Sequence, residues 1–300
     1  MNERTIAILG PGLLGGSLLQ DGLRLGWRMQ AWARREETAA AIRIHGLAAV
    51  ATTDLAQAVQ GASLIILTTP TGTYESLARR LAACQLELDA VVTDVGSVKQ
   101  AVLDGAGCIL RKAGIPFVGS HPMAGSHEVG LDAARTGLFA SAACLLTPEP
   151  DTSPGALQRV RNFWETLGCR VVEMNAAAHD AAVAHVSHMP HLAAAAVTLA
   201  ALAEQPELGA LAAGGLRDTT RVASGDPAMW KEILMTNRTA VLDAARKLQR
   251  NLGELLEMLE KVEDQALFTR LTAAKALRDA RYPRRIDGPQ PPPEPTSNHP

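Results

Sequence analysis

The sequence predicts an α/β protein in which an N-terminal, Rossmann-type doubly wound parallel sheet is followed by an all-α C-terminal domain. In the first half, short apolar runs alternate with helical patterns, which is typical of buried parallel strands joined by helices. After about Asn175 the strand-like runs stop, and alanine and leucine dominate a helical pattern. From about Tyr282 the chain is rich in proline. We therefore expect domains over residues 1–175 and 176–282, and a disordered tail over 283–300.

Short apolar segments of the first domain are expected to form the sheet. They are residues 5–9, 28–33, 63–69, 90–94, 115–119, 142–147 and 170–174. Near the end of the second domain an apolar seam repeats in steps of four and three, with charged residues between its members. The seam consists of Leu248, Leu252, Leu255, Leu259 and Val262. It predicts a long helix that packs either within a helical bundle or against a second copy of the chain.

Composition and charge exclude several classes of protein. The 300 residues are 47% hydrophobic and 20% charged, an ordinary globular balance, and 29 basic residues stand against 31 acidic ones. This balance offers no basic face for nucleic acid. No apolar run reaches the roughly 20 residues that cross a bilayer, and the cysteines form no CxxC pair. We expect a cytoplasmic protein that binds neither nucleic acid nor a membrane.

A glycine-rich turn, Gly10-Pro-Gly12-Leu13-Leu14-Gly15, follows the first expected strand directly. In dinucleotide-binding folds the first glycine permits the tight turn, the second lets the backbone approach a pyrophosphate, and the third lets helix and strand pack closely. The N-terminus of the following helix then faces the phosphates. The turn therefore predicts dinucleotide binding by the first domain. We also expect cofactor contacts from Thr69 and Pro70, at the end of the strand expected over residues 63–69.

The end of the second expected strand bears on the choice of cofactor. An NAD-selective site usually carries Asp or Glu about 20 residues after the glycines, where it holds the ribose hydroxyls. That position falls near Ala33, where there is no carboxylate, and Arg34 and Arg35 follow. Guanidinium groups suit a 2′-phosphate; the alternative is that both arginines are ordinary surface charges. We favour NADP over NAD.

Further stretches are dense in polar side chains. They are residues 94–99 (DVGSVK), 119–126 (GSHPMAGS), 179–191 (with HVSHMPH at its end) and 216–221 (LRDTTR), which leads on to Trp230. The first two stretches come just past expected strands, and ligands of open parallel sheets bind beyond the carboxyl ends of the strands. We therefore expect Ser97 and His121 to lie at a ligand site.

These stretches, in this order behind the glycine turn, resemble the prephenate dehydrogenase family, which includes arogenate and cyclohexadienyl dehydrogenases. The resemblance covers about residues 5–281, and GSHPMAG, SHxPH and RDxTR carry it. It implies an NAD(P)-dependent oxidative decarboxylation in tyrosine biosynthesis. Hydride would pass from the ring carbon bearing the 4-hydroxyl to the nicotinamide, and carbon dioxide would leave as the ring becomes aromatic. Prephenate would give 4-hydroxyphenylpyruvate, and arogenate would give tyrosine.

The resemblance also implies roles for single residues. His121 would accept the hydroxyl proton, with Ser97 hydrogen-bonded near the same hydroxyl. A neutral imidazole, whose reference pKa is about 6.5, suits that task. Arg221 matches the family's arginine for a substrate carboxylate, which a guanidinium grips through two parallel bonds. The alternative for Arg221 is an ion pair with Asp218 inside the helical domain.

Other residues of the helical domain are expected around the substrate. Ser187 and His191 lie four residues apart, hence on one face of a helix, although Pro190 is tolerated only in a first turn or at a kink. Trp230 would pack either as a wall of the site or in the core. We expect a small-molecule substrate and a homodimer formed through residues 176–282.

The histidines of the helical segment do not predict a metal site. His179, His185, His188 and His191 follow one another along one segment, and this spacing spreads them around a helix rather than converging them. We expect no metal. His185 and His188 are interpreted as structural, and His179-Asp180 as a pair at the start of a helix.

Two features depart from the family pattern. His127 stands where a glutamate is common, with Glu128 one position later, and no carboxylate lies near Ala33. The first bears on the charge balance around Arg221 and on the choice between a keto-acid and an amino-acid substrate. The second bears on the cofactor.

Two rival functions are less well supported by the residues. β-Hydroxyacid dehydrogenases and imine reductases share the layout but use a lysine in the helical domain, and Lys231 and Lys247 lack the asparagine expected three residues on. A nonenzymatic NADP sensor would keep the glycine turn and lose the acid–base residues, which this chain retains.

Overall fold

The computed structural model describes residues 5–125, 128 and 130–282. The chain packs as two compact units, Met1–Ala244 and Ala245–Pro300. The tail expected over 283–300, together with Ser126 and His127, lies outside the described residues. No helix in the described part of the chain is long and apolar enough to cross a membrane.

An eight-stranded sheet lies at the centre of the first unit, in the order β3-β2-β1-β4-β5-β6-β7-β8. The strands are β1 (Thr5–Leu9), β2 (Arg28–Trp32), β3 (Val50–Thr52), β4 (Leu64–Leu67), β5 (Val91–Asp94), β6 (Phe117–Pro122), β7 (Ala143–Thr147) and β8 (Arg170–Glu173). Neighbouring strands pair in parallel, except β6 and β7. From β1, the chain adds β2 and β3 on one side of the sheet, and then β4 to β8 on the other side. The strand order therefore reverses between β1 and β4, and such a switch point opens a crevice at the carboxyl ends of the strands.

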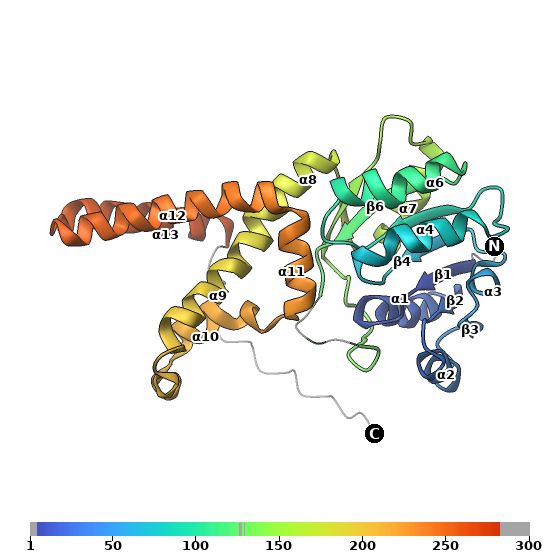
Figure 1. Cartoon of the computed structure of the whole chain (residues 1–300), viewed down its shortest axis with the longest axis horizontal. Helices are drawn as coiled ribbons and strands as arrows, with labels where there is room; N and C mark the ends of the chain where they lie inside the picture. The colour runs from blue at the N-terminus through green and yellow to red at the C-terminus, as the bar shows by residue number, and fades with distance from the viewer. Residues whose placement is uncertain (1–4, 126–127, 129, 283–300) are drawn as a thin grey trace, which may run out of the picture. The chain divides into compact units, whose positions relative to one another are not determined.

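The sheet is buried on both faces, which explains why its strands appear in the sequence as continuous apolar runs. Because successive side chains of a strand point to opposite faces, Ile6 and Ile8 join one apolar core and Ala7 and Leu9 join the other. Helices α1, α2 and α7 supply side chains to the first core, and α3, α4 and α6 supply the second. Figure 1 shows these helices arranged around the strands.

Short 3₁₀ and π segments adjoin several of the helices. The helices around the sheet are α1 (Leu13–Arg24), α2 (Glu36–Ile44), α3 (Leu55–Val59), α4 (Tyr74–Ala82), α5 (Gln100–Val102), α6 (Cys108–Lys112) and α7 (Pro154–Thr166). Those that follow the sheet are α8 (Ala176–Val183), α9 (Met189–Leu202), α10 (Gly214–Thr220), α11 (Pro227–Thr236), α12 (Arg238–Glu260) and α13 (Asp264–Arg281). The 3₁₀ segments are η1 (Thr71–Thr73), η4 (Pro206–Leu211) and η5 (Arg221–Ser224), and the π segments are η2 (Leu103–Gly107) and η3 (Ala184–His188).

The predicted architecture is confirmed, with two corrections to the sheet. Strand β3 was not expected, because three residues are too few to show a pattern of their own. The sheet is also not wholly parallel, since β6 pairs with β7 in antiparallel register, His121 opposite Leu145. This pairing extends β6 to Pro122. His121 therefore lies within a strand, whereas the sequence predicts it in the loop beyond the strand.

The second unit is made by the end of α12 and by α13. Arg270 of α13 pairs with Glu254 of α12 and donates a hydrogen bond of 2.8 Å to Asn251. The predicted seam forms on α12, but Val262 is not part of it. That residue lies in the turn after the helix with a φ of 56°, a left-handed conformation that is rare for a β-branched side chain.

Candidate active site

The glycine turn has one open position and several crowded ones. A Cβ built at Gly10 would lie 2.8 Å from the backbone nitrogen of Thr69, and one at Gly15 would lie 2.6 Å from the carbonyl oxygen of Gly10. At Gly12, by contrast, no described atom lies within 4 Å of a built Cβ. The crowded glycines therefore permit close packing of β1, α1 and the end of β4, while Gly12 leaves space beside the backbone.

Helix α1 begins directly at this open space. Gly12 is its N-cap residue and no side chain caps it, so the amides of Leu13 and Leu14 lie at an uncapped N-terminus. Such a terminus favours an anion, because the unpaired N–H groups and the helix dipole both present positive charge. The geometry fits the pyrophosphate of a dinucleotide.

Thr69 and Pro70 lie on the other side of the switch point. Thr69 contacts the glycine turn, and its hydroxyl lies 2.7 Å from that of Thr73. Glu232 of α11 accepts hydrogen bonds from the hydroxyl of Thr71 and the amide of Gly72. The loop after β4 is thus tied to a helix that the sequence places more than a hundred residues later.

Arg34 and Arg35 follow β2 and are both exposed. No ion pair or hydrogen bond joins either guanidinium to another described residue. The nearest acidic residue in the sequence, Glu36, is paired with Arg43. The end of β2 therefore carries two uncommitted positive charges and no carboxylate at Ala33.

A buried carboxylate at the end of β5 joins the two stretches that carry Ser97 and His121. Asp94 accepts hydrogen bonds from the amide of Gly96 at 2.8 Å and from the amide of Ser120 at 3.0 Å, and it pairs with the ammonium group of Lys99. Both residues of the ion pair are fully buried. Each amide belongs to the residue just before Ser97 or His121, so a single side chain fixes both.

Lys99 reinforces the same junction. Its ammonium group also donates a hydrogen bond of 2.9 Å to the carbonyl of Ser120. Burial lowers the pKa of Lys99, and the Asp94 carboxylate opposes that shift. In the sequence, Lys99 is one of several polar residues of the DVGSVK stretch, and nothing in the spacing shows that the lysine turns inward.

His121 is buried and contacts a second histidine. Its Nδ1 lies 2.9 Å from Nε2 of His179, whose own Nδ1 lies 2.8 Å from a carboxylate oxygen of Asp180. Burial lowers the pKa of His121 well below its usual value, and the nearby His179 and Lys99 lower it further. His121 is therefore a neutral imidazole at neutral pH. Ser97, half-buried, makes no hydrogen bond through its hydroxyl to another described residue.

His179 and Asp180 lie near the start of a helix, but neither residue caps it. Helix α8 begins at Ala176, where the side chain of Asn175 accepts a hydrogen bond of 2.8 Å from the amide of Ala178. His179 is the fourth residue of α8 and Asp180 is the fifth, and both side chains are buried.

His191 and Trp230 contact each other directly. Their rings stack with centroids 3.6 Å apart and planes 8° apart. The π segment η3 precedes α9, and Pro190 is near the first residue of that helix, where its missing N–H costs least. Ser187 is half-buried within η3, so it and His191 are not separated by a regular α-helical turn. Segments of this kind are frequent at functional sites.

His188 has a structural setting. It is 1% exposed, and its Nδ1 lies 3.2 Å from the side-chain nitrogen of Asn237. Asn237 also donates a hydrogen bond of 2.8 Å to the carbonyl of Asp180. Burial lowers the pKa of His188 to about 4. The expectation of a structural role agrees with these contacts, whereas His185 is exposed.

Arg221 does not form the ion pair that was its alternative role. It is exposed in η5, and within the described residues no ion pair joins it to Asp218. Glu128 lies 3.6 Å from Arg135 and pairs with it. The described contacts stack His191 on Trp230 and link the stretches of Ser97 and His121 through Asp94. The backbone of Val222, the residue after Arg221, hydrogen-bonds to His191. The η5 segment that carries Arg221 therefore lies beside the His191–Trp230 pair.

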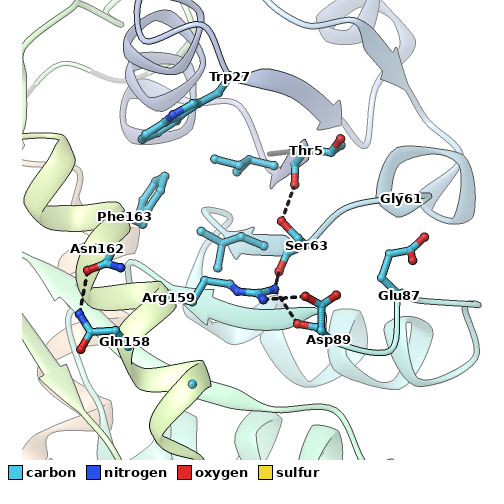
Figure 2. Close-up of a pocket in the computed structure, with 13 residues that line it drawn as sticks. Thr5, Trp27, Gly61, Ser63, Glu87, Asp89, Gln158, Arg159, Asn162 and Phe163 are labelled. Atoms are coloured by element: carbon cyan, nitrogen blue, oxygen red, sulfur yellow. Dashed lines mark hydrogen bonds and ion pairs between the residues drawn. The ribbon is translucent and has the colours of Figure 1, made fainter. Parts of the chain in front are cut away.

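A separate pocket of about 650 Å³ lies at the opposite edge of the sheet. Residues at the amino ends of β1 and β4 form part of its lining, and the polar side chains of Ser63 and Arg159 hydrogen-bond to other lining residues. Figure 2 shows the guanidinium of Arg159 reaching Asp89 and the carbonyl of Ser63, with Trp27 and Phe163 on the apolar side. The pocket is not part of the candidate active site.

The sheet, its switch point and the glycine turn are those of a dinucleotide-binding protein. Residues 29–173 match the family model for the prephenate dehydrogenase nucleotide-binding domain, and residues 175–273 match that for the prephenate dehydrogenase dimerization domain. The chain therefore belongs to the prephenate dehydrogenase family.

Individual relatives agree with the family models. The prephenate dehydrogenase of Bacillus subtilis is 34% identical over 284 residues, which are 92% of this chain and 75% of that protein. The Aquifex aeolicus prephenate dehydrogenase, solved with hydroxyphenyl propionate and NAD+, is 29% identical with a TM-score of 0.86, covering 94% of this chain and 99% of that one. The Synechocystis arogenate dehydrogenase is 31% identical with a TM-score of 0.80, covering 93% and 100%.

Proposed function

We propose that this chain oxidises and decarboxylates prephenate to 4-hydroxyphenylpyruvate, with NADP as the favoured cofactor. Arogenate, which would give tyrosine directly, is the alternative substrate, because the similar proteins include both kinds of dehydrogenase. The observation that carries the proposal is the buried, neutral imidazole of His121 beside the carboxyl end of β5. Loss of hydride from a carbon that bears a hydroxyl requires an acceptor for the hydroxyl proton, and a neutral imidazole is such an acceptor.

His121 takes that proton, and Ser97 hydrogen-bonds to the same substrate oxygen. The nicotinamide, when bound, supplies the acceptor for the hydride. General-base assistance of this kind contributes about 10²–10⁴ in rate. The lowered pKa of His121 keeps the ring unprotonated at neutral pH, so one of its nitrogens is free to accept a proton.

The glycine turn and the start of α1 hold the cofactor. Gly10 and Gly15 pack the turn, the space at Gly12 admits the pyrophosphate, and the amides of Leu13 and Leu14 donate to it. Thr69 and Pro70 line the crevice from the β4 side. Arg34 and Arg35 bind the 2′-phosphate, which is why we favour NADP.

The substrate carries two carboxylates and a ring. Arg221 binds one carboxylate through paired hydrogen bonds, and Ser187 and His191 bind polar groups beside it. Trp230 forms a wall of the site behind His191. Residues 1–175 serve as the cofactor domain and 176–282 as the substrate and dimerisation domain.

The assembly is a homodimer through the helical domain. Leu252, Leu256 and Leu259 of α12 and Phe268 of α13 are all at least half exposed in the single chain. Several large exposed apolar side chains on one pair of helices are typical of a protein interface. Light scattering on the purified protein should give twice the mass of one chain, and a stable monomer would contradict this assignment.

The direct test is a rate assay that crosses prephenate and arogenate with NAD and NADP. Reduced nicotinamide is followed by its absorbance, and the product is identified by chromatography. The fastest rate is expected with prephenate and NADP. Arogenate faster than prephenate, or NAD preferred over NADP, would overturn that part of the proposal. No rate in any combination, with dinucleotide binding intact, would overturn the proposed function.

A further inference from the structure

Three buried side chains form a hydrogen-bonded line that ends at His121. The line runs from Asp180 through His179, with separations of 2.8 Å and 2.9 Å between the bonded atoms. His179 is 0% exposed, His121 7% and Asp180 8%. Water therefore competes little with these bonds, and each ring is held by its neighbour.

The carboxylate at the far end of the line is firmly anchored. Asp180 accepts hydrogen bonds from the backbone amides of Lys99 at 2.8 Å and Gln100 at 3.0 Å. Burial alone would raise the pKa of Asp180, but the hydrogen bonds from His179 and from these two amides outweigh it and lower the pKa. Asp180 is thus an ionised group whose oxygens only accept.

An accepting carboxylate fixes where the protons lie along the whole line. His179 must carry its proton on Nδ1, which faces Asp180. Because burial lowers its pKa, His179 is neutral and carries no second proton, so its Nε2 bears a lone pair. His121 must then donate from its own Nδ1. Since His121 is also neutral, its Nε2 is left with the lone pair.

We propose that His179 and Asp180 are positioning residues, which hold His121 in the tautomer whose Nε2 accepts the substrate's hydroxyl proton. The inference rests on the proposed function for the identity of the base, and it adds which nitrogen acts and what sets its state. Sequence reasoning missed it because His179 is 58 positions from His121 and only the fold brings them together.

The line also receives the charge that the reaction creates. The substrate O–H bond breaks, the proton goes to His121 Nε2, and the electron pair of the neighbouring C–H bond leaves as hydride to the nicotinamide. The O–H electron pair forms a C=O bond. When carbon dioxide leaves, the pair of the broken C–C bond enters the ring, and the oxygen takes its proton back from His121. The transient imidazolium is stabilised through His179 by the Asp180 carboxylate.

Replacing the carboxylate with an amide removes the negative charge, and it reverses the line when the amide nitrogen takes the place of the oxygen that accepts from His179 and from the Lys99 amide. If the NH₂ of an asparagine at position 180 faces His179, that ring must accept at Nδ1 and donate from Nε2. His121 would then accept at Nδ1 and carry its proton on Nε2, where it could not take another. In the Ser-His-Asp triads of hydrolases the equivalent change lowers kcat by about 10⁴, because the imidazole is held in the wrong tautomer.

The first measurement observes the tautomer itself. Histidine-selective ¹⁵N labelling and two-dimensional ¹H–¹⁵N NMR of the intact chain distinguish a protonated from an unprotonated ring nitrogen, with His121→Asn used to assign the signals of His121. The expected result at neutral pH is a protonated Nδ1 and an unprotonated Nε2. A proton on Nε2 would overturn the proposal, whether or not any variant folds.

The second measurement is kinetic and uses a matched set of variants. His179→Leu removes both hydrogen bonds, whereas the amide of His179→Gln can accept from His121 and donate to Asp180. His179→Leu and Asp180→Asn should lower kcat about 10²–10³-fold, within the range of general-base assistance. KM for the substrate and the Kd for the dinucleotide should change less than about threefold. His179→Gln should recover at least about tenfold of the kcat lost in His179→Leu. His185→Gln, on an exposed position of η3, is the control.

The outcomes separate this inference from the proposed function. Near-normal kcat in His179→Leu, or equal loss in the Leu and Gln variants, would overturn the positioning role while wild-type activity upholds the function. A silent wild-type enzyme would overturn the function, and the NMR result would still decide the tautomer.

Discussion

The imidazole of His191 lies flat on the indole of Trp230, with ring centroids 3.6 Å apart and an angle of 8° between the planes. The two residues come from α9 and α11, so the stack fixes one helix of the substrate domain against another. It also fixes the orientation of a ring that we assign to the substrate.

Trp230→Leu should therefore weaken substrate binding. Aromatic pairs contribute about 0.5–1.5 kcal/mol beyond burial, so we expect KM for the substrate to rise about 2- to 10-fold. Trp230→Phe keeps a flat ring and should retain most of the affinity. Steady-state kinetics and thermal unfolding are measured together. A lower melting temperature with unchanged KM would make Trp230 a core residue only.

Gly12 and Gly15 should respond to alanine in opposite ways. In Gly12→Ala, the added Cβ has no described atom within 4 Å, so the free energy of unfolding should stay unchanged. The added methyl enters the space assigned to the pyrophosphate, and we expect Kd for NADP to rise about 5- to 100-fold, equivalent to about 1–3 kcal/mol. Gly15→Ala, whose Cβ would lie 2.6 Å from the Gly10 carbonyl, should instead destabilise the fold. Urea unfolding and fluorescence titration give the two quantities. Unaltered NADP binding in Gly12→Ala would remove the cofactor from that space.

The arginines after β2 should control the choice between NADP and NAD. Charge-assisted hydrogen bonds contribute about 1.5–3 kcal/mol, so Arg34→Ala with Arg35→Ala should raise KM for NADP about 10- to 100-fold. KM for NAD, which has no 2′-phosphate, should hardly change. Arg28→Ala is the matched control, since Arg28 is also exposed but lies at the other end of the same strand. Equal effects on both cofactors would mean that the pair does not contact the 2′-phosphate.

Much of the fold could be predicted because it depends on local patterns. The alternation of buried strands with helices, and the glycines at the end of β1, are visible in short windows of sequence. The direction of a strand is not: β7 is as apolar as its neighbours, and only the path of the chain between β6 and β7 turns it antiparallel.

The candidate site was predictable where a single residue type has a specific chemistry. His121 and Ser97 stand out in their motifs, but their supports do not. The supporting residues are Lys99, His179 and Asp180. Their contacts join residues that are distant in the sequence or depend on side chains that the fold turns inward, and no spacing rule reports such contacts. Their burial is the physical signal, and it exists only in three dimensions.

The buried histidines should make the protein sensitive to acid. The pKa of His188 is lowered to about 4 by burial, while in the unfolded chain it is near 6.5. The unfolded state therefore binds more protons between these values, and stability is full above pH 6.5 and is lost as the pH falls toward 4. The shift of His188 alone contributes about 3 kcal/mol to the free energy of unfolding at neutral pH. His188→Gln should reduce the dependence by about one proton, as measured by urea unfolding across this range. An identical slope in the variant would show that His188 does not titrate on unfolding.

Arg221 should affect binding more than turnover. It is exposed and makes no ion pair with Asp218 in the described part of the chain, so its removal should not disturb the fold. A carboxylate contact present before and during the reaction contributes equally to both states, and its loss raises KM with little change in kcat. For Arg221→Ala we expect KM to rise about 10- to 100-fold, from about 1.5–3 kcal/mol for a charge-assisted contact. Arg221→Lys keeps the charge but not the paired geometry, so its KM should fall between those of the wild type and the alanine variant. If instead Arg221→Ala lowered kcat at constant KM, Arg221 would act on the transition state and not on the bound carboxylate.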